Sequence, residues 1–185
     1  MESYKLRFMD GLKIIEEMEL LMNIEVWKPI KDFPNYQISN RSRVKNITSG
    51  KIVKQCINSH GYYHVKLTNM IKRYTCTVHR LVAEAFIDNS DNKICIDHIN
   101  RDRLDNDIGN LRWASHTENN QNASKRKDNT SGISGVILNK KLNKWQVYIN
   151  INGKRQHGGC FIDKNEAIAK RKAMEIEYFG EFAPK

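Results

Sequence analysis

Residues 94–122 read ICIDHINRDRLDNDIGNLRWASHTENNQN, and we expect this stretch to decide the fold. At its centre stands Asp97-His98, a carboxylate beside an imidazole that titrates near neutral pH. Two amides follow at Asn110 and Asn119. Carboxylate and amide oxygens are hard ligands that suit Mg²⁺ or Mn²⁺ better than zinc. The stretch therefore indicates a site that pairs a divalent metal with a group able to accept a proton.

The first part of this stretch alternates isoleucine with smaller or polar residues, which predicts a strand ending at His98. Neighbours in a strand point to opposite faces, so Asp97 and His98 can serve one site only where the strand ends or bulges. The polar run over 100–109 has no period and predicts a loop.

The second part predicts a short strand over 110–114 and then a helix. Ser115 or Thr117 can cap this helix, and Glu118 falls in its first turn. We expect the helix to carry Asn119 back toward the first strand, so that the metal lies between hairpin and helix.

Several pieces of the chain, in order and spacing, resemble the HNH endonuclease family, and most of all its phage and intron homing branch. The matching pieces are VHRLVAEAF at 78–86, IDHIN at 96–100, LDN at 104–106 and NLRWAS at 110–115. The resemblance implies a ββα-metal nuclease core that hydrolyses phosphodiester bonds.

The resemblance also implies roles for four residues. Asp97 and Asn119 would hold one divalent metal, His98 would be the general base that activates water, and Asn110 would brace the loop and orient the histidine. Asn119 stands where many family members have a second histidine, which shifts the expected metal from zinc to Mg²⁺ or Mn²⁺.

Each of these residues has a plainer interpretation when taken alone. An Asp-His pair is usually a surface or satisfied core pair, and an asparagine is usually a turn or solvated residue. Their common order and spacing favours the site. His79 lies among apolar neighbours, and we expect it to pack or hydrogen-bond rather than bind metal.

Composition limits the partners of this chain of 185 residues. Its net charge of +10 points to a polyanion or a membrane as partner, and the resemblance implies that the partner is double-stranded DNA. The sequence has no run of about 18 apolar residues, so it does not predict a membrane-spanning helix. The four cysteines are widely spaced without a C-x-x-C pair, so we expect no structural zinc and a reducing compartment. The first residues do not resemble a signal peptide, which favours an intracellular protein that is not secreted.

The residues ahead of the core predict a helix or extension over 1–24 and a small β-rich module over 25–70. The module resembles a nuclease-associated module found ahead of HNH cores, through pieces such as Trp27, Pro29, Arg43-Val44 and Gly61-Tyr62. Its basic residues are candidate phosphate contacts, with a solvated basic face as an equal alternative for any one of them. These candidates are Arg41, Arg43, Lys45, Lys51 and Lys54.

After the nuclease core over 71–122, residues 123–130 predict a basic linker in which Lys125 and Arg126 are candidate DNA contacts. Residues 131–185 predict three strands and a helix, and resemble the APETALA2-type DNA-binding domain. By the period of two, Trp145, Val147 and Ile149 face the helix. The opposite face and strand ends offer DNA contacts. These candidates are Lys144, Gln146, Tyr148, Lys154, Arg155 and His157.

We therefore expect an α+β protein in which a ββα-metal (HNH) nuclease core lies between a small β-rich N-terminal module and a three-stranded-sheet-plus-helix C-terminal domain. One Asp97-His98 site and no heptad run predict a monomer that nicks one DNA strand at a time. Two alternatives stay open. One is a non-catalytic DNA-binding regulator that keeps the nuclease fold, and the other is an RNA-acting enzyme, although no aromatic single-strand platform is evident.

Overall fold

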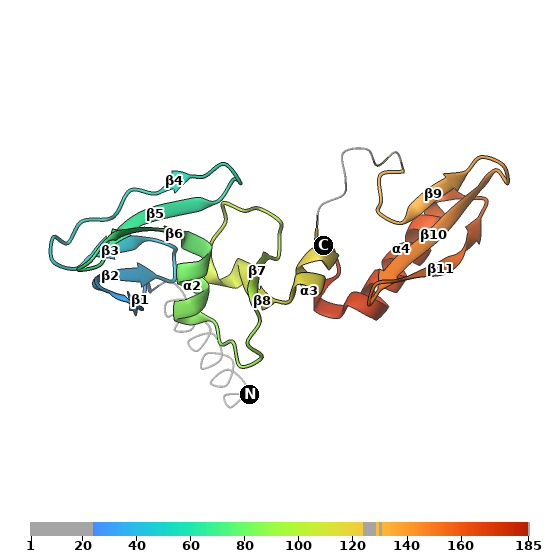
Figure 1. The fold of residues 1–185 in the computed structure, drawn as a ribbon. Coiled ribbons are helices and arrows are strands. Elements are labelled where there is room, and N and C mark those ends of the chain that lie inside the picture. The colour runs from blue at the N-terminus through green and yellow to red at the C-terminus, as the bar shows by residue number, and fades with distance from the viewer. Residues whose placement is uncertain (1–23, 124–128, 130, 185) are drawn as a thin grey trace, which may run out of the picture.

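The computed structural model describes residues 24–123, 129 and 131–184. Residues 1–23 of the predicted helix or extension and the linker candidates Lys125 and Arg126 lie outside the described residues. The described chain forms two lobes, a larger one from β1 to α3 and a smaller one from β9 to α4 (Figure 1). No helix within the described ranges is long and apolar enough to cross a membrane.

Two three-stranded antiparallel sheets build most of the larger lobe. Their strand orders are β1-β2-β3 and β4-β5-β6. The strands are β1 (Trp27–Ile30), β2 (Phe33–Ser39), β3 (Val44–Asn46), β4 (Cys56–Ile57), β5 (Tyr63–Thr68) and β6 (Arg73–Thr77). The predicted β-rich module over 25–70 contains β1 to β5. The predicted module boundary at residue 70 falls in the turn between β5 and β6.

Helix α2 (Val78–Phe86) covers the predicted helical run and packs between these sheets and the ββα unit. Its apolar side buries Val78, Leu81 and Val82 in a core shared with both sheets. Leu111 of the following unit joins the same core. The N-terminal module and the nuclease core are therefore packed as one body.

The predicted strand–loop–strand–helix unit is confirmed. It consists of β7 (Cys95–His98), a loop with a 3₁₀ turn η1 (Ile108–Asn110), β8 (Leu111–Ala114) and α3 (His116–Gln121). β7 and β8 pair antiparallel. Ser115 and Glu118 form a capping box at the start of α3, in which each side chain bonds the backbone N–H of the other residue.

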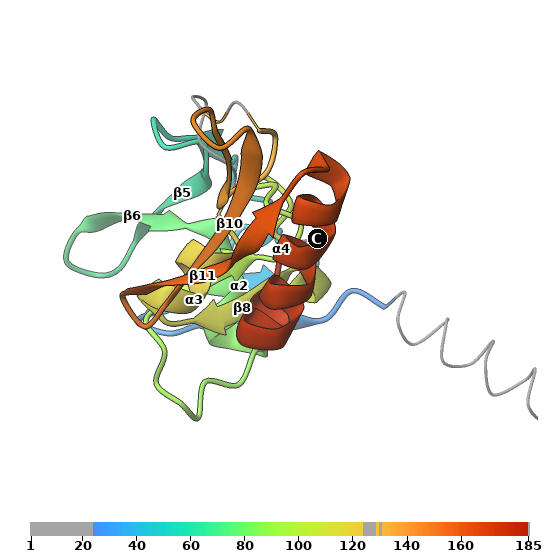
Figure 2. The ribbon, with the colours of Figure 1, turned by 90° about the vertical axis from the view of Figure 1, so that its right-hand side faces the viewer.

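The smaller lobe has an antiparallel sheet in the order β11-β10-β9, with one face covered by a helix (Figure 2). Its elements are β9 (Val136–Asn139), β10 (Lys144–Ile151), β11 (Lys154–Phe161), α4 (Lys164–Phe179) and a final 3₁₀ turn η2 (Gly180–Phe182). This order matches the predicted three strands and helix. The helix approaches so closely that a Cβ at Gly158 would lie 2.5 Å from the sulfur of Met174.

Candidate active site

Three elements of the larger lobe converge on the carboxylate of Asp97, which is buried at the end of β7. Arg112 is its cross-strand partner on β8, and its Nε and Nη2 both donate to Asp97 Oδ2, at 2.9 and 2.7 Å. Asn122, just after α3, donates from Nδ2 to Oδ1 and Oδ2 at 3.0 and 3.1 Å. The hairpin and the helix therefore hold this carboxylate from two sides.

Asn122 also binds the backbone where the chain leaves β7. Its Nδ2 donates to the carbonyl oxygens of His98 and Ile99, at 2.9 and 3.3 Å. The clamp holds the strand end at which two neighbours, Asp97 and His98, can face one site. The opposite end of the amide, Asn122 Oδ1, is buried and has no hydrogen-bond partner among the described residues.

The direct bond to Asp97 comes from Asn122, a residue that was not predicted, and the expected approach of Asn119 to Asp97 stays a prediction. Asn119 lies three residues earlier on α3, half-buried, and its side chain makes no hydrogen bond within the described part of the chain. Positions three apart lie on one helix face, so this spacing could have identified Asn122 from the sequence. The role of Asn119 as a metal ligand stays a prediction.

The imidazole of His98 is held by Asn106, a buried residue that the sequence reasoning missed. His98 Nε2 lies 3.0 Å from Asn106 Oδ1, and the other end of this amide, Nδ2, donates to the carbonyl oxygen of Leu104 at 3.3 Å. An amide oxygen can only accept, so this contact favours the tautomer of the neutral ring that carries its proton on Nε2 and leaves Nδ1 as an acceptor. The tripeptide 104–106 was part of the resemblance, but it lies in an irregular loop, where no strand or helix periodicity could indicate that Asn106 is buried.

Asn110 braces the loop between the two strands, as the resemblance implied. Its Oδ1 accepts from the backbone N–H of Asn100 at 2.9 Å, and its Nδ2 donates to the carbonyl oxygen of Asp105 at 2.7 Å. It acts on His98 through the loop, while the direct bond to the ring comes from Asn106.

His79 packs edge-on against His98, with ring centroids 5.4 Å apart, and against Tyr62 at 4.9 Å. Burial first, then the neighbouring His98 and Arg80, lower the pKa of His79 to about 4. The ring is thus neutral near pH 7 and serves as a wall for His98. The prediction that His79 packs is confirmed.

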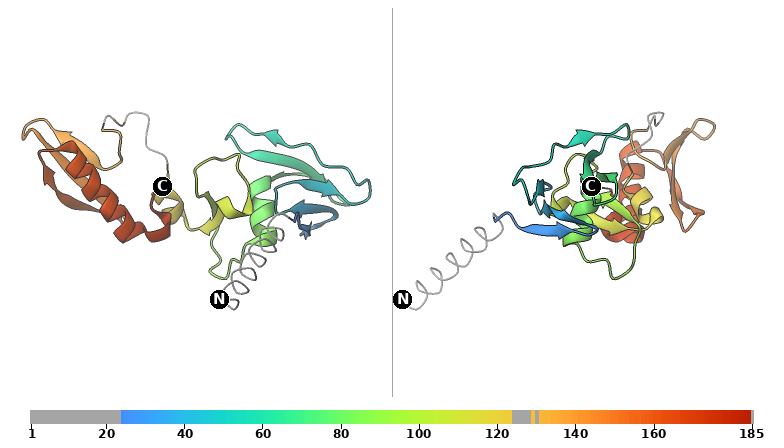
Figure 3. Two further views of the ribbon diagram at one scale, coloured as in Figure 1. Left: turned by 180° about the vertical axis from the view of Figure 1, so that it is seen from behind. Right: turned by 60° about the vertical axis from the view of Figure 1, so that its left-hand side comes forward.

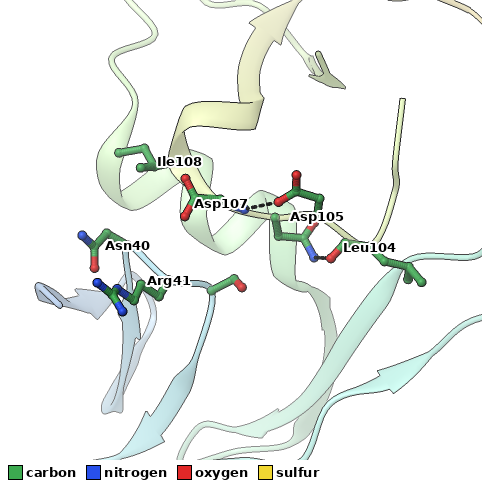
Figure 4. A pocket seen from close by; sticks show the side chains of 8 residues that line it. Asn40, Arg41, Leu104, Asp105, Asp107 and Ile108 are labelled. Atoms are coloured by element: carbon green, nitrogen blue, oxygen red, sulfur yellow. Dashed lines mark hydrogen bonds between the residues drawn. The ribbon is translucent and has the colours of Figure 1, made fainter. Parts of the chain in front are cut away.

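A polar hollow of about 480 Å³ lies beside this loop, between residues 40–42 of the N-terminal module and residues 104–108 (Figure 4). Arg41 lines it opposite Asp105 and Asp107. The predicted DNA contact Arg41 therefore lies next to the segment that holds His98.

Two other basic candidates of the N-terminal module have protein partners. Arg43 Nε donates to Glu25 Oε1 at 2.8 Å and its guanidinium lies over the ring of Trp27. Lys45 Nζ lies 4.2 Å from the centroid of the same ring. The two cations thus help to order the start of the module, and their DNA contacts stay predictions.

The C-terminal sheet places four of the predicted DNA contacts, Gln146, Tyr148, Arg155 and His157, on one face, while Lys154 pairs with Ile151 at the strand end. Arg155 lies 3.7 Å over the ring of Tyr148, and His157 pairs with Tyr148 across the strands. The hydroxyl of Tyr148 donates to Gln146 at 3.1 Å. Val147 and Ile149 are buried on the opposite face, under α4. The predicted separation of faces is confirmed.

The residues around Asp97 fit a hard divalent cation. Arg112 binds only Oδ2 of Asp97, which leaves Oδ1 with one neutral donor, Asn122 Nδ2. The orphaned Oδ1 of Asn122 is a buried acceptor near the same carboxylate. The described ranges contain no group of three or more His, Cys, Asp or Glu arranged for a metal. A carboxylate with amide oxygens is a donor set that suits Mg²⁺ or Mn²⁺.

A two-stranded hairpin and a short helix that enclose an aspartate, a histidine and amides define the ββα class of metal nuclease sites. Residues 76–121 match the family model described as HNH endonuclease, and residues 25–68 match the NUMOD4 motif. The chain belongs to the HNH endonuclease family.

Several curated relatives support this assignment. The chain is 31% identical over 173 residues to "Uncharacterized HNH endonuclease L245" of Acanthamoeba polyphaga mimivirus, covering 82% of this chain and 52% of that one. It is 37% identical over 101 residues to the DNA endonuclease I-HmuI of Bacillus phage SP01, covering 54% and 58%. It is 35% identical over 88 residues to protein 3.8 of Escherichia phage T7, covering 48% and 72%. The chain thus spans a little over half the length of the first two.

A solved structure is also similar. It is described as "DNA binding and cleavage by the HNH homing endonuclease I-HmuI", and it aligns with a TM-score of 0.51 at 28% identity over 71% of this chain and 76% of that chain.

Proposed function

We propose that the protein is a metal-dependent DNA endonuclease of the homing type, which hydrolyses phosphodiester bonds in double-stranded DNA. The observation that carries the proposal is the buried Asp97-His98 pair, with the carboxylate clamped by Arg112 and Asn122 and the imidazole held by Asn106. A side chain held by fixed partners keeps the geometry that a hydrolytic step needs.

In the proposed mechanism Nδ1 of His98 takes a proton from water, and the resulting oxygen attacks phosphorus in line. The bond from phosphorus to the 3′ oxygen breaks and that oxygen takes a proton from solvent water, which leaves a 5′-phosphate and a 3′-hydroxyl. Asp97 and Asn119, with the orphaned Oδ1 of Asn122 beside them, would hold one Mg²⁺ or Mn²⁺, whose charge offsets that of the phosphate and the leaving oxygen. Asn106 keeps the proton on Nε2, so that Nδ1 is the atom free to act as base.

We further propose that the flanking parts select the site. The C-terminal lobe would act as an APETALA2-type domain whose sheet addresses base edges through Gln146, Arg155 and His157. The NUMOD4 match and the position of Arg41 beside the catalytic loop favour DNA docking by the N-terminal module. With one site per chain, a monomer would nick one strand per binding event.

Plasmid nicking tests the proposal. Supercoiled DNA is incubated with the protein and Mg²⁺ or Mn²⁺, and nicked circles are expected before linear product. The His98→Ala variant should leave the plasmid supercoiled, while His116→Ala, at an exposed histidine of α3, should nick as the wild type does. Equal cleavage in the presence of EDTA would contradict the proposed requirement for a divalent metal. Binding without cleavage under all conditions would favour the non-catalytic regulator.

A further inference from the structure

The end of the chain packs on the nuclease lobe. After α4, the turn η2 places Phe182 beside α3, and Figures 1 and 3 show this end of the chain next to α3 from opposite sides. Phe182 is 5% exposed. Its ring is not part of the hydrophobic cluster of its own lobe, and it contacts Arg112 and Lys93 of the larger lobe.

Two cations of the nuclease lobe enclose this ring. The guanidinium carbon of Arg112 lies 3.9 Å from the ring centroid, and Lys93 Nζ lies 5.3 Å from it. Lys93 is itself tied to α3 by an ion pair with Glu118 at 3.0 Å. Cation–π contacts gain strength where water is excluded, and the side chain of Arg112 is only 13% exposed.

Arg112 connects this contact to the active site with separate atoms. Its Nη1 donates to the carbonyl oxygen of Glu181, while its Nε and Nη2 hold Asp97. The contact with the tail and the bonds to Asp97 therefore use different nitrogen atoms of one guanidinium.

We propose that Phe182 determines specificity by docking the DNA-reading lobe on the nuclease lobe at a fixed distance from Asp97-His98. This proposal rests on the proposed function. A duplex is stiff over the length of one protein and advances about 3.4 Å per base pair. A fixed distance between the reading sheet and the catalytic pair therefore becomes a fixed number of base pairs between the recognised sequence and the cut.

The experiment compares full-length variants on a duplex selected from a random library by wild-type cleavage. Cut positions are mapped to the nucleotide on end-labelled DNA, and the contacted bases are footprinted on the same DNA. Phe182→Ala removes the ring, Phe182→Tyr keeps it, and Ile176→Ala is a matched control at an exposed apolar residue of α4. Lys93→Met weakens the dock from the core side.

Wild type, Phe182→Tyr and Ile176→Ala should cut at one phosphate. Phe182→Ala should spread its cuts over several neighbouring phosphates. It should also cut the selected site roughly tenfold more slowly, because DNA bound by the C-terminal lobe is then held less often beside the nuclease lobe, which lowers its effective concentration there. Its footprint over the sequence read by the C-terminal sheet and its nicking of unrelated plasmid should be unchanged. Lys93→Met should shift cut positions in the same direction by less. In DNA-free solution, small-angle scattering should give Phe182→Ala a larger radius of gyration.

The proposal is overturned if Phe182→Ala keeps one cut position and the wild-type radius of gyration. It is also overturned if plasmid nicking falls as much as site-specific cleavage, because the tail would then act on the catalytic centre. These outcomes differ from failure of the proposed function, in which the wild-type protein itself neither nicks plasmid with Mg²⁺ or Mn²⁺ nor protects a specific sequence.

Discussion

The region around Asp97-His98 and the face of the C-terminal sheet that carries Arg155 both present polar side chains, but the first is buried and the second is open to water. Asp97, His98, Asn106 and Asn122 are all at most 5% exposed, and each has a partner in another element or loop. On the sheet, Arg155 and His157 are exposed, Gln146 and Tyr148 are half-buried, and Arg155 lies over the ring of Tyr148. Chemistry requires atoms held at fixed distances, whereas base readout requires donors that a groove can reach.

The two regions also depend on their scaffolds differently. A polar group that is buried without a partner destabilises the fold, so the catalytic set must be satisfied as a network. The sheet face needs only the apolar cluster behind it, from Val136 to Met174, to keep its shape. Substitutions in the first region should therefore affect chemistry and stability, and those in the second only recognition.

The largest expected effect is that of His98→Ala on cleavage. Loss of the general base should lower the cleavage rate by about 10²–10⁴-fold. DNA affinity should be retained, because the basic surfaces are untouched. Single-turnover cleavage and gel-shift titration of the same protein separate the two effects. Wild-type rates in this variant would remove His98 from the mechanism.

Acid should destabilise the larger lobe through His79. The pKa of this ring is lowered to about 4, mainly by burial, so between pH 6.5 and 4 the unfolded chain binds a proton that the folded chain does not. The free energy of unfolding is unaffected by this ring above pH 6.5. It decreases as the pH falls below that value, by about 2 kcal/mol at pH 5.

Urea unfolding at pH 7.5 and pH 5 measures this loss. His79→Gln should reduce the dependence on pH, even though it lowers stability at both values. The control His157→Gln, at an exposed histidine of the sheet, should leave the dependence unchanged. Equal pH dependence in wild type and His79→Gln would contradict the assignment.

Substitutions of Asn122 and Asn119 should affect metal-dependent cleavage for different reasons. Asn122→Ala removes the clamp on Asp97 and the strand end, and a partner that orients a metal ligand typically changes metal affinity by about 10–100-fold. Asn119→Ala should also impair cleavage if its oxygen binds the metal. Asn120→Ala, at an exposed position of α3, is the matched control. Cleavage titrated with Mg²⁺ and Mn²⁺ measures the shift, and no shift in Asn122→Ala would mean that the clamp is dispensable.

The sequence predicted the elements whose side chains follow a period. The alternation in β10 and the start of α3 are local patterns, and both are present, with Ser115 rather than Thr117 as the cap. Asn106 and Asn122 lie in irregular segments, where a contact depends on how distant parts of the chain pack. Resemblance located Asp97 and His98, but not the residues that hold them, and it gave no sign that Phe182 reaches the other lobe.

The smallest effect we expect is that of Arg155→Ala, on the exposed side of the comparison. Arg155 stacks on Tyr148 and is not enclosed by protein, so the sheet should keep its fold. If Arg155 reads a base, the variant should lose about 1–3 kcal/mol at one position of the site and relax the preference there. If it touches phosphate, binding should weaken evenly and the salt slope should fall by about one. Binding titrations at several salt concentrations, on the selected site and its single-base variants, distinguish the two outcomes. Lys170→Ala, on the exposed part of α4, is the control. Unchanged affinity, preference and salt slope in Arg155→Ala would show that this residue does not contact DNA. Gln146 and His157 would then be the remaining candidates for base contacts on this face of the sheet.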